Sequence, residues 1–172
     1  MSSDSETEII LYQLEVTEEM HTFVNGPNGG WDNAAKKYPA WNAHLEVTGI
    51  TGGSKKWKTE YFEFYRPVAK LATDDLEEAF GIGNAYGGAH SDMVERGLLE
   101  PLLPMIEMRN GHITPNMHSM SIGDICKKGD EYFMCDPTGF GLIEVTEHVG
   151  ISIESEYNKE RTANILCQPS SQ

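Results

Sequence analysis

The chain has 172 residues, a length that suits one domain with a buried core. Its apolar fraction of 39% and charged fraction of 23% are ordinary for a soluble globular protein, but its formal charge of -14 is not. Such a charge excludes free nucleic acid as a preferred ligand, because a polyanion is bound by clustered lysine and arginine, and it matches anionic membrane poorly.

The cysteine content and the chain ends favour a cytoplasmic protein. Three cysteines are too few for a fold held together by disulfides. The first residues are polar and acidic, unlike a signal peptide, and no apolar run approaches the roughly 20 residues of a membrane span. We expect a disordered segment at 1–7, a single domain at 8–160 and a flexible tail at 161–172.

Acidic residues are concentrated in separate blocks. Residues 1–20 carry six acids and no lysine or arginine, and residues 74–100 carry seven acids and one arginine. Residues 21–73, between these blocks, carry four acids against seven bases. The blocks form either a solvated face that keeps the protein soluble or an anionic surface that binds a basic partner.

The first half of the chain predicts strands and one short helix. Ile9–Val16 has β-forming residues on both parities, which indicates a strand. Residues 24–33 are rich in Gly and Asn and predict a loop, and a short helix follows around Asn33–Tyr38, ended by the next proline. His44–Ile50 and Thr59–Arg66 alternate like strands, so we expect a β-hairpin there.

Two short helices are expected between about residues 74 and 103. The first begins with Asp74 as its cap and Glu77 at capping-box spacing, and Gly81 and Gly83 end it. The second begins near Ser91 and is limited by prolines. Acids in the first turns suit the positive end of the helix dipole.

The C-terminal part of the chain predicts β structure. Asn110-Gly111 between extended flanks is a strong hairpin signal. In the stretch 117–145, Lys-Lys-Gly-Asp and Pro-Thr-Gly supply turns between strands, and a further strand is expected near 151–153. One sheet face would carry Ile122, Tyr132, Met134 and Phe140. The prediction is an α+β fold: a mixed or antiparallel sheet with hairpins at both ends of the chain and the two helices between them.

Residue types that bind metals gather in the same region, but not at metal-site spacing. His112, His118, Cys126 and Cys135 lie within this part of the chain, yet structural zinc sites have two close ligand pairs and no Cys-x-x-Cys is present. The two cysteines are more simply explained as core residues on strands. We predict no metal ligand and no cofactor. A metal-dependent enzyme or accessory factor that uses His112, His118 and Asp136 is kept as an alternative.

Other signs of chemistry are weak. The glycine-rich residues 81–88 follow a helix instead of a strand, which is wrong for a dinucleotide fingerprint, and no Lys-Ser/Thr pair follows. The serines lack a Gly-x-Ser-x-Gly elbow. The paired carboxylates of the segment 74–78 lie at an exposed helix start, where nothing raises the pKa of a general acid. No catalytic residue is predicted, and the sequence favours a binding protein over an enzyme.

The tryptophans are the remaining candidates for a site. Trp31, Trp41 and Trp57 lie close to lysines and to Tyr38, an arrangement that also occurs in platforms for single-stranded nucleic acid. Because the net charge opposes that function, we interpret these rings as core anchors or as part of a protein-binding patch.

Two segments resemble a scattered group of small bacteriophage and prophage proteins. The shared pattern is a VA-x-(I/L)-x-A-x-DLEE-x-F helix start, an H-S-x-S-V-G-D segment and a final G-F. The matching residues are Val68, Ala69, Asp75, Leu76, Glu77, Phe80, Asn84, His118, Ser119, Ser121, Gly123, Asp124, Gly139 and Phe140. The resemblance covers just under half of the chain. It implies a viral or mobile-element origin and no catalytic residues, and the cysteines at 126 and 135 depart from the aliphatic residues of the pattern.

The leading hypothesis is an acidic phage-type accessory protein that binds a host protein with a basic surface. Its sharpest form is a DNA mimic, whose carboxylates occupy the nucleic-acid cleft of a defence enzyme. A virion structural or assembly component that forms a homo-oligomer is the second alternative. The predicted partner-binding residues are Glu15, Glu18, Glu19, Asp74, Asp75, Glu77, Glu78, Asp92 and Glu95.

Overall fold

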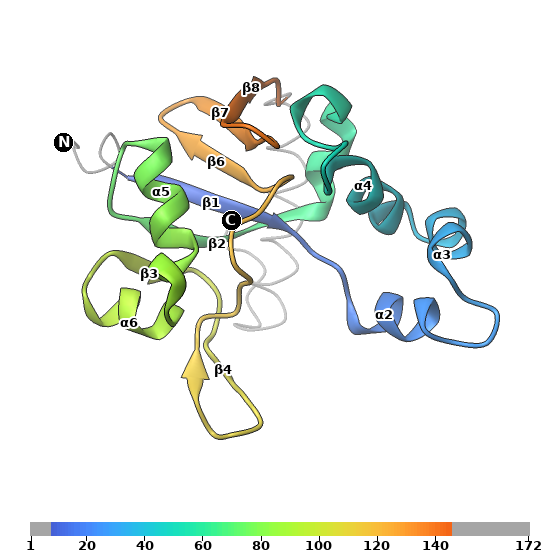
Figure 1. Cartoon of the computed structure of the whole chain (residues 1–172), viewed down its shortest axis with the longest axis horizontal. Helices are drawn as coiled ribbons and strands as arrows, with labels where there is room; N and C mark the ends of the chain where they lie inside the picture. Colours follow the sequence, from blue (N-terminus) through green and yellow to red (C-terminus); the bar gives the residue numbers. More distant parts are fainter. Residues whose placement is uncertain (1–7, 146–172) are drawn as a thin grey trace, which may run out of the picture.

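The strand predicted at the start of the chain is β1 (Ile9–Leu14), an inner strand of the main sheet. The structure is a computed structural model and describes residues 8–145. Six strands are arranged in the order β3-β2-β1-β6-β7-β8, and each neighbouring pair is antiparallel (Figure 1). The other strands of this sheet are β2 (Tyr65–Leu71), β3 (Leu99–Pro101), β6 (Ile125–Lys128), β7 (Glu131–Cys135) and β8 (Phe140–Ile143).

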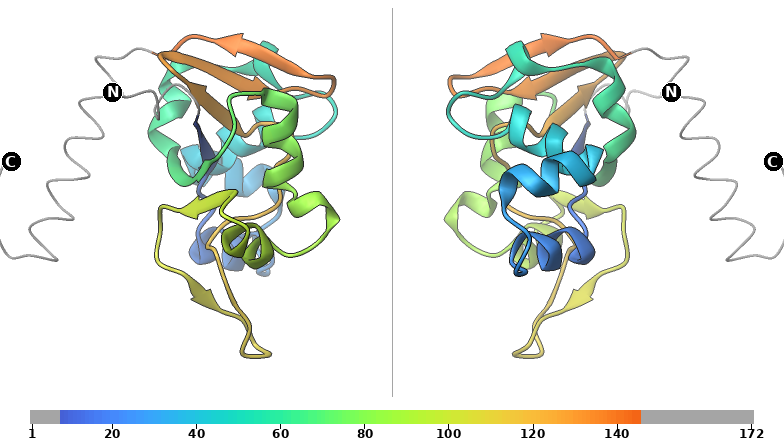
Figure 2. Two further views of the ribbon diagram at one scale, coloured as in Figure 1. Left: turned by 90° about the vertical axis from the view of Figure 1, so that its left-hand side faces the viewer. Right: turned by 90° about the vertical axis from the view of Figure 1, so that its right-hand side faces the viewer.

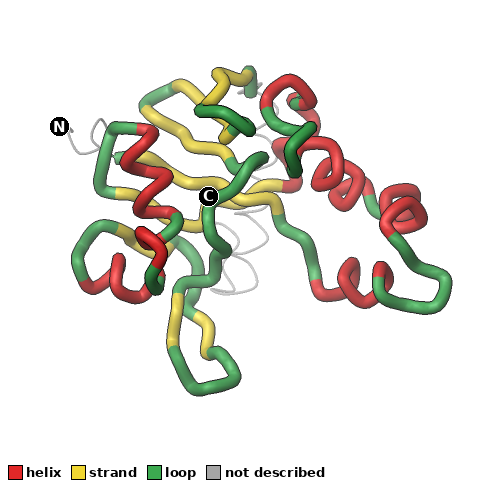
Figure 3. The backbone as a smooth tube through the Cα atoms, in the orientation of Figure 1, coloured by secondary structure: helices red, strands yellow, loops and turns green. Residues whose placement is uncertain are grey.

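Helices are inserted at two points of the chain and lie at opposite ends of the sheet (Figures 1 and 3). Between β1 and β2 lie α2 (Glu18–Val24), α3 (Trp31–Lys37), α4 (Pro39–Val47) and the 3-10 helices η1 (Ser54–Lys56) and η2 (Thr59–Phe64). Between β2 and β3 lie α5 (Leu76–Gly83), the 3-10 helix η3 (Ala85–Gly87) and α6 (His90–Glu95). The predicted α+β fold is confirmed. Within 8–145, no helix is long and apolar enough to cross a membrane.

The Asn110-Gly111 hairpin is confirmed as a separate two-stranded sheet of β4 (Ile106–Glu107) and β5 (Ile113–Thr114). The Met108 N–H donates to the His112 carbonyl at 2.8 Å, and Gly111 takes the positive φ of +85° that the turn requires. The hairpin projects from the body of the molecule (Figures 1 and 2).

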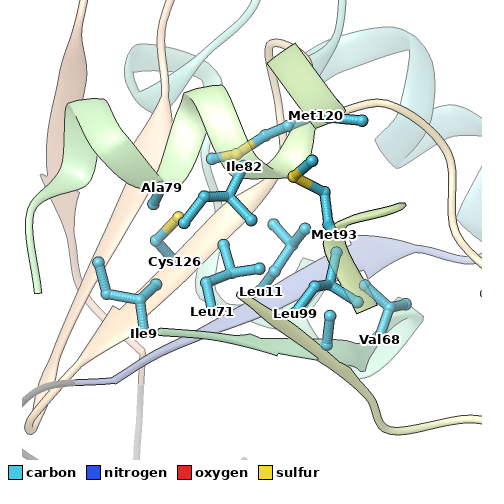
Figure 4. Close-up of a cluster of buried hydrophobic side chains, with 12 residues drawn as sticks. Ile9, Leu11, Val68, Leu71, Ala79, Ile82, Met93, Leu99, Met120 and Cys126 are labelled. Atoms are coloured by element: carbon cyan, nitrogen blue, oxygen red, sulfur yellow. The ribbon is translucent and has the colours of Figure 1, made fainter. Parts of the chain in front are cut away.

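Both faces of the sheet are covered, which explains why β1 carries apolar residues on both parities. One face packs under α5 and α6, and Figure 4 shows Ile82 of α5 and Met93 of α6 above Leu11. The other face packs under α4 and η2, with Val47 against a layer of aromatic side chains. The sheet residues of this second face are Tyr12, Leu14, Tyr65, Ile125, Tyr132, Met134 and Ile143. Phe140, expected beside Met134, packs instead with the first face.

A β-bulge separates the two halves of the β1–β2 pair. Leu11 pairs with Ala69 and Tyr12 with Pro67, so Val68 is the extra residue. A proline has no N–H to donate to a neighbouring strand, and a bulge is one of the few places in a sheet that tolerates it.

The N-terminal hairpin predicted from His44–Ile50 and Thr59–Arg66 is wrong. Residues 44–47 belong to α4, which begins with Pro39 in its first turn and buries Ala40, Ala43 and Val47 at helical spacing. Residues 59–64 form η2, because Tyr61 turns inward against the Trp57 ring, 6.1 Å away between centroids. The strand starts only at Tyr65.

Three smaller differences concern helices. α2 forms where no helix is expected, with the Thr17 hydroxyl accepting the Met20 N–H at 3.3 Å as its cap. The predicted helix near 33–38 is confirmed as α3, and the predicted helix near Ser91 as α6. The cap of α5 is Asp75 instead of Asp74, and the two glycines expected to end α5 lie inside its last turn, with Asn84 as the C-cap.

Candidate functional site

The motif Ser-Ile-Gly-Asp forms a tight turn that begins β6. The Asp124 N–H donates to the Ser121 carbonyl at 3.0 Å, and the Ser121 N–H donates to the Asp124 carboxylate at 3.0 Å. Gly123 has a φ of +98°, and a Cβ there would lie 3.1 Å from the Val47 carbonyl oxygen of α4. The turn is therefore closed by Asp124 and pressed against α4.

Gln13 of β1 joins this turn to the centre of the sheet. Its Nε2 donates to the Asp124 carboxylate at 3.0 Å and to the His118 carbonyl at 2.9 Å. Its Oε1 accepts the His118 N–H at 3.1 Å. Both ends of a buried amide are thus used on a segment more than 100 positions away in the sequence.

Asp124 is buried, and it forms no ion pair with any residue in the part of the chain that the structure describes. Burial raises the pKa of its carboxyl to about 6, although the nearby His118 charge and the Ser121 and Gln13 hydrogen bonds act in the opposite direction. The Tyr65 hydroxyl donates to the Gly123 carbonyl at 2.6 Å, and burial and the Asp124 charge raise the pKa of Tyr65.

A cavity of about 500 Å³ opens beside this network, and three histidines line it. Burial, followed by the charges of His118 and His21, lowers the pKa of His44. His21 and His44 both pack on the Trp41 ring, with centroid distances of 6.2 and 5.1 Å. His118 is exposed, and its Nδ1 lies 2.8 Å from the Ser119 carbonyl oxygen and 3.3 Å from Gln13 Nε2.

The titratable side chains at this cavity include three imidazoles and the buried Asp124 carboxyl, which are the groups that general acid–base chemistry would need. Nucleophilic catalysis would need a hydroxyl or thiol hydrogen-bonded to the base, and within residues 8–145 no side-chain hydroxyl or thiol is bonded to the His118 ring. The side chains of Asp124 and Gln13 form hydrogen bonds with backbone groups and with each other. We interpret the network as the structural element that fixes segment 117–124 to the sheet.

A second, larger hollow is a groove of about 730 Å³ between α5 and the turn that joins β7 to β8. Apolar side chains form most of its wall: Phe80, Met120, Ile122, Pro137 and Phe140. The charged residues that line it are Glu77 and Asp136. Thr48 and Ser121 line both hollows, so the groove adjoins the histidine cavity.

The nine acids predicted to bind a partner are all exposed, but they form two groups. Asp74, Asp75, Glu77, Glu78, Asp92 and Glu95 lie at the α5–α6 end of the molecule, and Glu15, Glu18 and Glu19 lie at or near α2 (Figure 1). In the second group, Glu15 pairs with Arg66 at 3.4 Å and Glu19 accepts the Tyr38 hydroxyl at 2.8 Å. The first group is called the α5–α6 acidic surface below.

The residues of the metal-dependent alternative are not brought together. His112 contacts Ser91 at 3.2 Å on the projecting hairpin, whereas both Asp136 carboxylate oxygens accept hydrogen bonds from Ser54. Among the described residues, no three His, Cys, Asp or Glu side chains could hold a metal ion. The prediction that Cys126 and Cys135 are core residues is confirmed, since both are buried.

The tryptophans divide between core and surface. Trp41 is buried, and Trp57 is half-buried, with its ring N–H donating to the Glu144 carbonyl at 2.8 Å. Trp31 is 66% exposed. The core-anchor interpretation therefore holds for the first two and is wrong for Trp31.

Sequence reasoning missed Gln13, His44 and Tyr65. The sequence offered one signal for Gln13: it is an uncharged polar residue in an otherwise apolar strand, and a polar side chain buried in such a strand needs a hydrogen-bond partner.

Comparison with protein-family models, with curated proteins and with solved structures found no match in any of the three. The resemblance to phage proteins therefore stays a prediction.

Proposed function

We propose that this protein binds a partner protein with a basic surface through its α5–α6 acidic surface. One observation carries the proposal: every Asp and Glu between residues 74 and 100 is exposed, and none of them forms an ion pair within residues 8–145. The two ion pairs of the described chain, Arg66–Glu15 and Lys70–Glu8, lie elsewhere. Carboxylates that repel one another at one end of a protein gain most from cations supplied by a partner.

The structure also limits how the surface is used. Asp75 accepts the Glu77 N–H as the cap of α5, and Glu78 accepts the Thr73 hydroxyl at 2.6 Å. The other acids of the surface make no side-chain hydrogen bond to any residue of the described range 8–145, so Asp74 and Glu95 are available to a partner without loss of a contact seen there. DNA mimicry, the sharpest form of the proposal, would place these carboxylates where a nucleic-acid-binding protein holds phosphates.

The test is affinity capture from bacterial cells with three forms of the full chain side by side. The first is wild type, the second carries Asp74→Lys and Glu95→Lys, and the third carries Glu63→Lys and Glu107→Lys. The two double variants change the net charge equally, and all four residues are exposed. We expect a partner retained by wild type and by the third form and lost by the second. Equal retention by all three forms would refute the proposal.

A self-associating structural or assembly component is the second candidate, and the projecting hairpin favours it. Met105, Ile106, Met108 and Ile113 are each at least 40% exposed there. An exposed apolar patch on a two-stranded sheet is a common site of protein association. Sedimentation at rising protein concentration tests this candidate. Large oligomers that Ile106→Thr with Met108→Gln dissolves would support it, and a monomer throughout would exclude it.

A further inference from the structure

The groove beside α5 has an apolar wall and an acidic rim. Phe80 is 41% exposed although it is a large aromatic side chain, and it stands at the groove with Phe140 and Pro137. Glu77, one helical turn before Phe80, lines the same groove and belongs to the α5–α6 acidic surface. Among the residues that the structure describes, no lysine, arginine or histidine lines this groove.

We infer that the groove binds a segment of the partner in which a large apolar side chain is flanked by lysine or arginine; this rests on the proposed function. The volume of about 730 Å³ exceeds what one side chain fills, and it falls in the range of ordinary ligand sites. The apolar side chain gains by leaving water against Phe80, Met120 and Phe140, and the flanking cations lie near Glu77.

Charge complementarity favours a basic partner segment in the groove over nucleic acid, anionic lipid or the chain's own C-terminal part. The acidic rim disfavours nucleic acid and anionic lipid, whose phosphates would meet carboxylates. The chain's own C-terminal part, residues 144–172, carries five acids against two bases and is no better matched. Of the two acids that line the groove, Asp136 is already bonded to Ser54, so Glu77 and its neighbours on α5 supply the attraction.

The experiment uses the full chain labelled with ¹³C at the methionine methyl groups. Met120 lines the groove and reports binding there, whereas the buried Met93 and Met134 do not line it and report the integrity of the fold. Three short synthetic peptides serve as probes: a phenylalanine flanked by lysines, a serine flanked by lysines, and a phenylalanine flanked by glutamates.

We expect the lysine–phenylalanine peptide to shift the Met120 methyl signal and to bind at least about tenfold more tightly than the lysine–serine peptide. Phe80→Ser should remove that advantage while the Met93 and Met134 signals stay in place. Glu77→Lys should weaken both lysine peptides by a similar factor, because it reverses the charge at the groove and leaves the apolar wall intact.

The outcomes separate this inference from the proposed function. If both lysine peptides bind equally, leave Met120 unmoved and are lost in the Asp74→Lys, Glu95→Lys variant, the groove assignment fails and the acidic surface stands. If the glutamate–phenylalanine peptide binds as tightly as the lysine–phenylalanine peptide, the groove takes apolar groups without regard to charge, and the stated partner chemistry is overturned.

Discussion

Gln13 Nε2 donates to the Asp124 carboxylate at 3.0 Å across a separation of 111 residues. This bond joins an inner strand of the sheet to the most patterned stretch of the sequence. Because the same amide also holds both backbone groups of His118, one side chain determines how the segment before β6 lies on the sheet. The stretch 117–145 is, on this account, mainly structural, and it also supplies residues such as Met120 and Phe140 to the wall of the groove.

Replacing Gln13 by alanine should lower the free energy of unfolding by about 3 kcal/mol, because the buried Asp124 carboxylate loses one of its two donors and the partly buried backbone groups of His118 lose their Gln13 partner. Urea unfolding measures the loss. Asn33→Ala is the matched control, since that amide also donates to two backbone carbonyls but at the exposed start of α3, and it should cost less than about 1 kcal/mol. Equal costs would contradict the role assigned to Gln13.

The Asp124 carboxyl should make stability depend on pH in the opposite sense to an ion-paired acid. Its folded pKa of about 6 lies above its ordinary value of 3.8, so between these values the folded protein holds a proton that the unfolded chain has lost. Stability from this group is present at low pH and declines as pH rises to about 6, by about 3 kcal/mol in total.

Asp124→Asn keeps the acceptor and removes the titration. The stability of wild type relative to this variant should therefore fall as the pH rises towards about 6, and it should change little at higher pH. Unfolding titrations from pH 4.5 to 7.5 measure it. A difference that is constant over this range would show that the carboxyl titrates normally.

Gly123→Ala should destabilise the protein by about 2 to 3 kcal/mol, because alanine meets both a φ of +98° and the α4 backbone. Gly129, at φ +62° with nothing within 4 Å of an added Cβ, provides the control. Its replacement by alanine should cost only about 1 kcal/mol. Thermal melts of the two variants decide the matter, and a Gly129 cost as large as that of Gly123 would exclude crowding as the cause.

The two core cysteines should resist labelling. Burial, followed by the charge of Asp124, raises the pKa of the Cys135 thiol to about 12 and raises that of Cys126 as well. In a Cys167→Ser variant at pH 8, an aromatic disulfide reagent should react at least about a thousandfold more slowly with the native protein than with the protein in urea. Fast labelling of the native form would show that the sheet opens near β7.

The C-terminal β region could be predicted because short local sequence motifs specify its turns. Lys-Lys-Gly-Asp, Pro-Thr-Gly and Asn110-Gly111 each need only neighbouring residues to form, and all three turns are present. The helices after residue 74 could be predicted for the same reason, because acidic residues stand in their first turns.

The N-terminal half could not be predicted in the same way. His44–Ile50 has an alternation that suits a strand, but burial of Ala43 and Val47 against the aromatic face of the sheet selects a helix. The pairing of β1 with both β2 and β6 joins segments more than 50 and 100 residues apart, and no local signal specifies it. The groove shares this origin, since α5 and the β7–β8 turn meet only in the folded chain.

The affinity of the captured partner tests the central claim most directly. It should be measured for wild type, for Asp74→Lys with Glu95→Lys, and for Glu63→Lys with Glu107→Lys, each at low and at high salt. Wild type and the third form should bind equally, the second at least about tenfold more weakly, and all should weaken as salt rises. Equal affinities for the three forms, or an affinity that salt does not change, would contradict an acidic docking surface on α5 and α6.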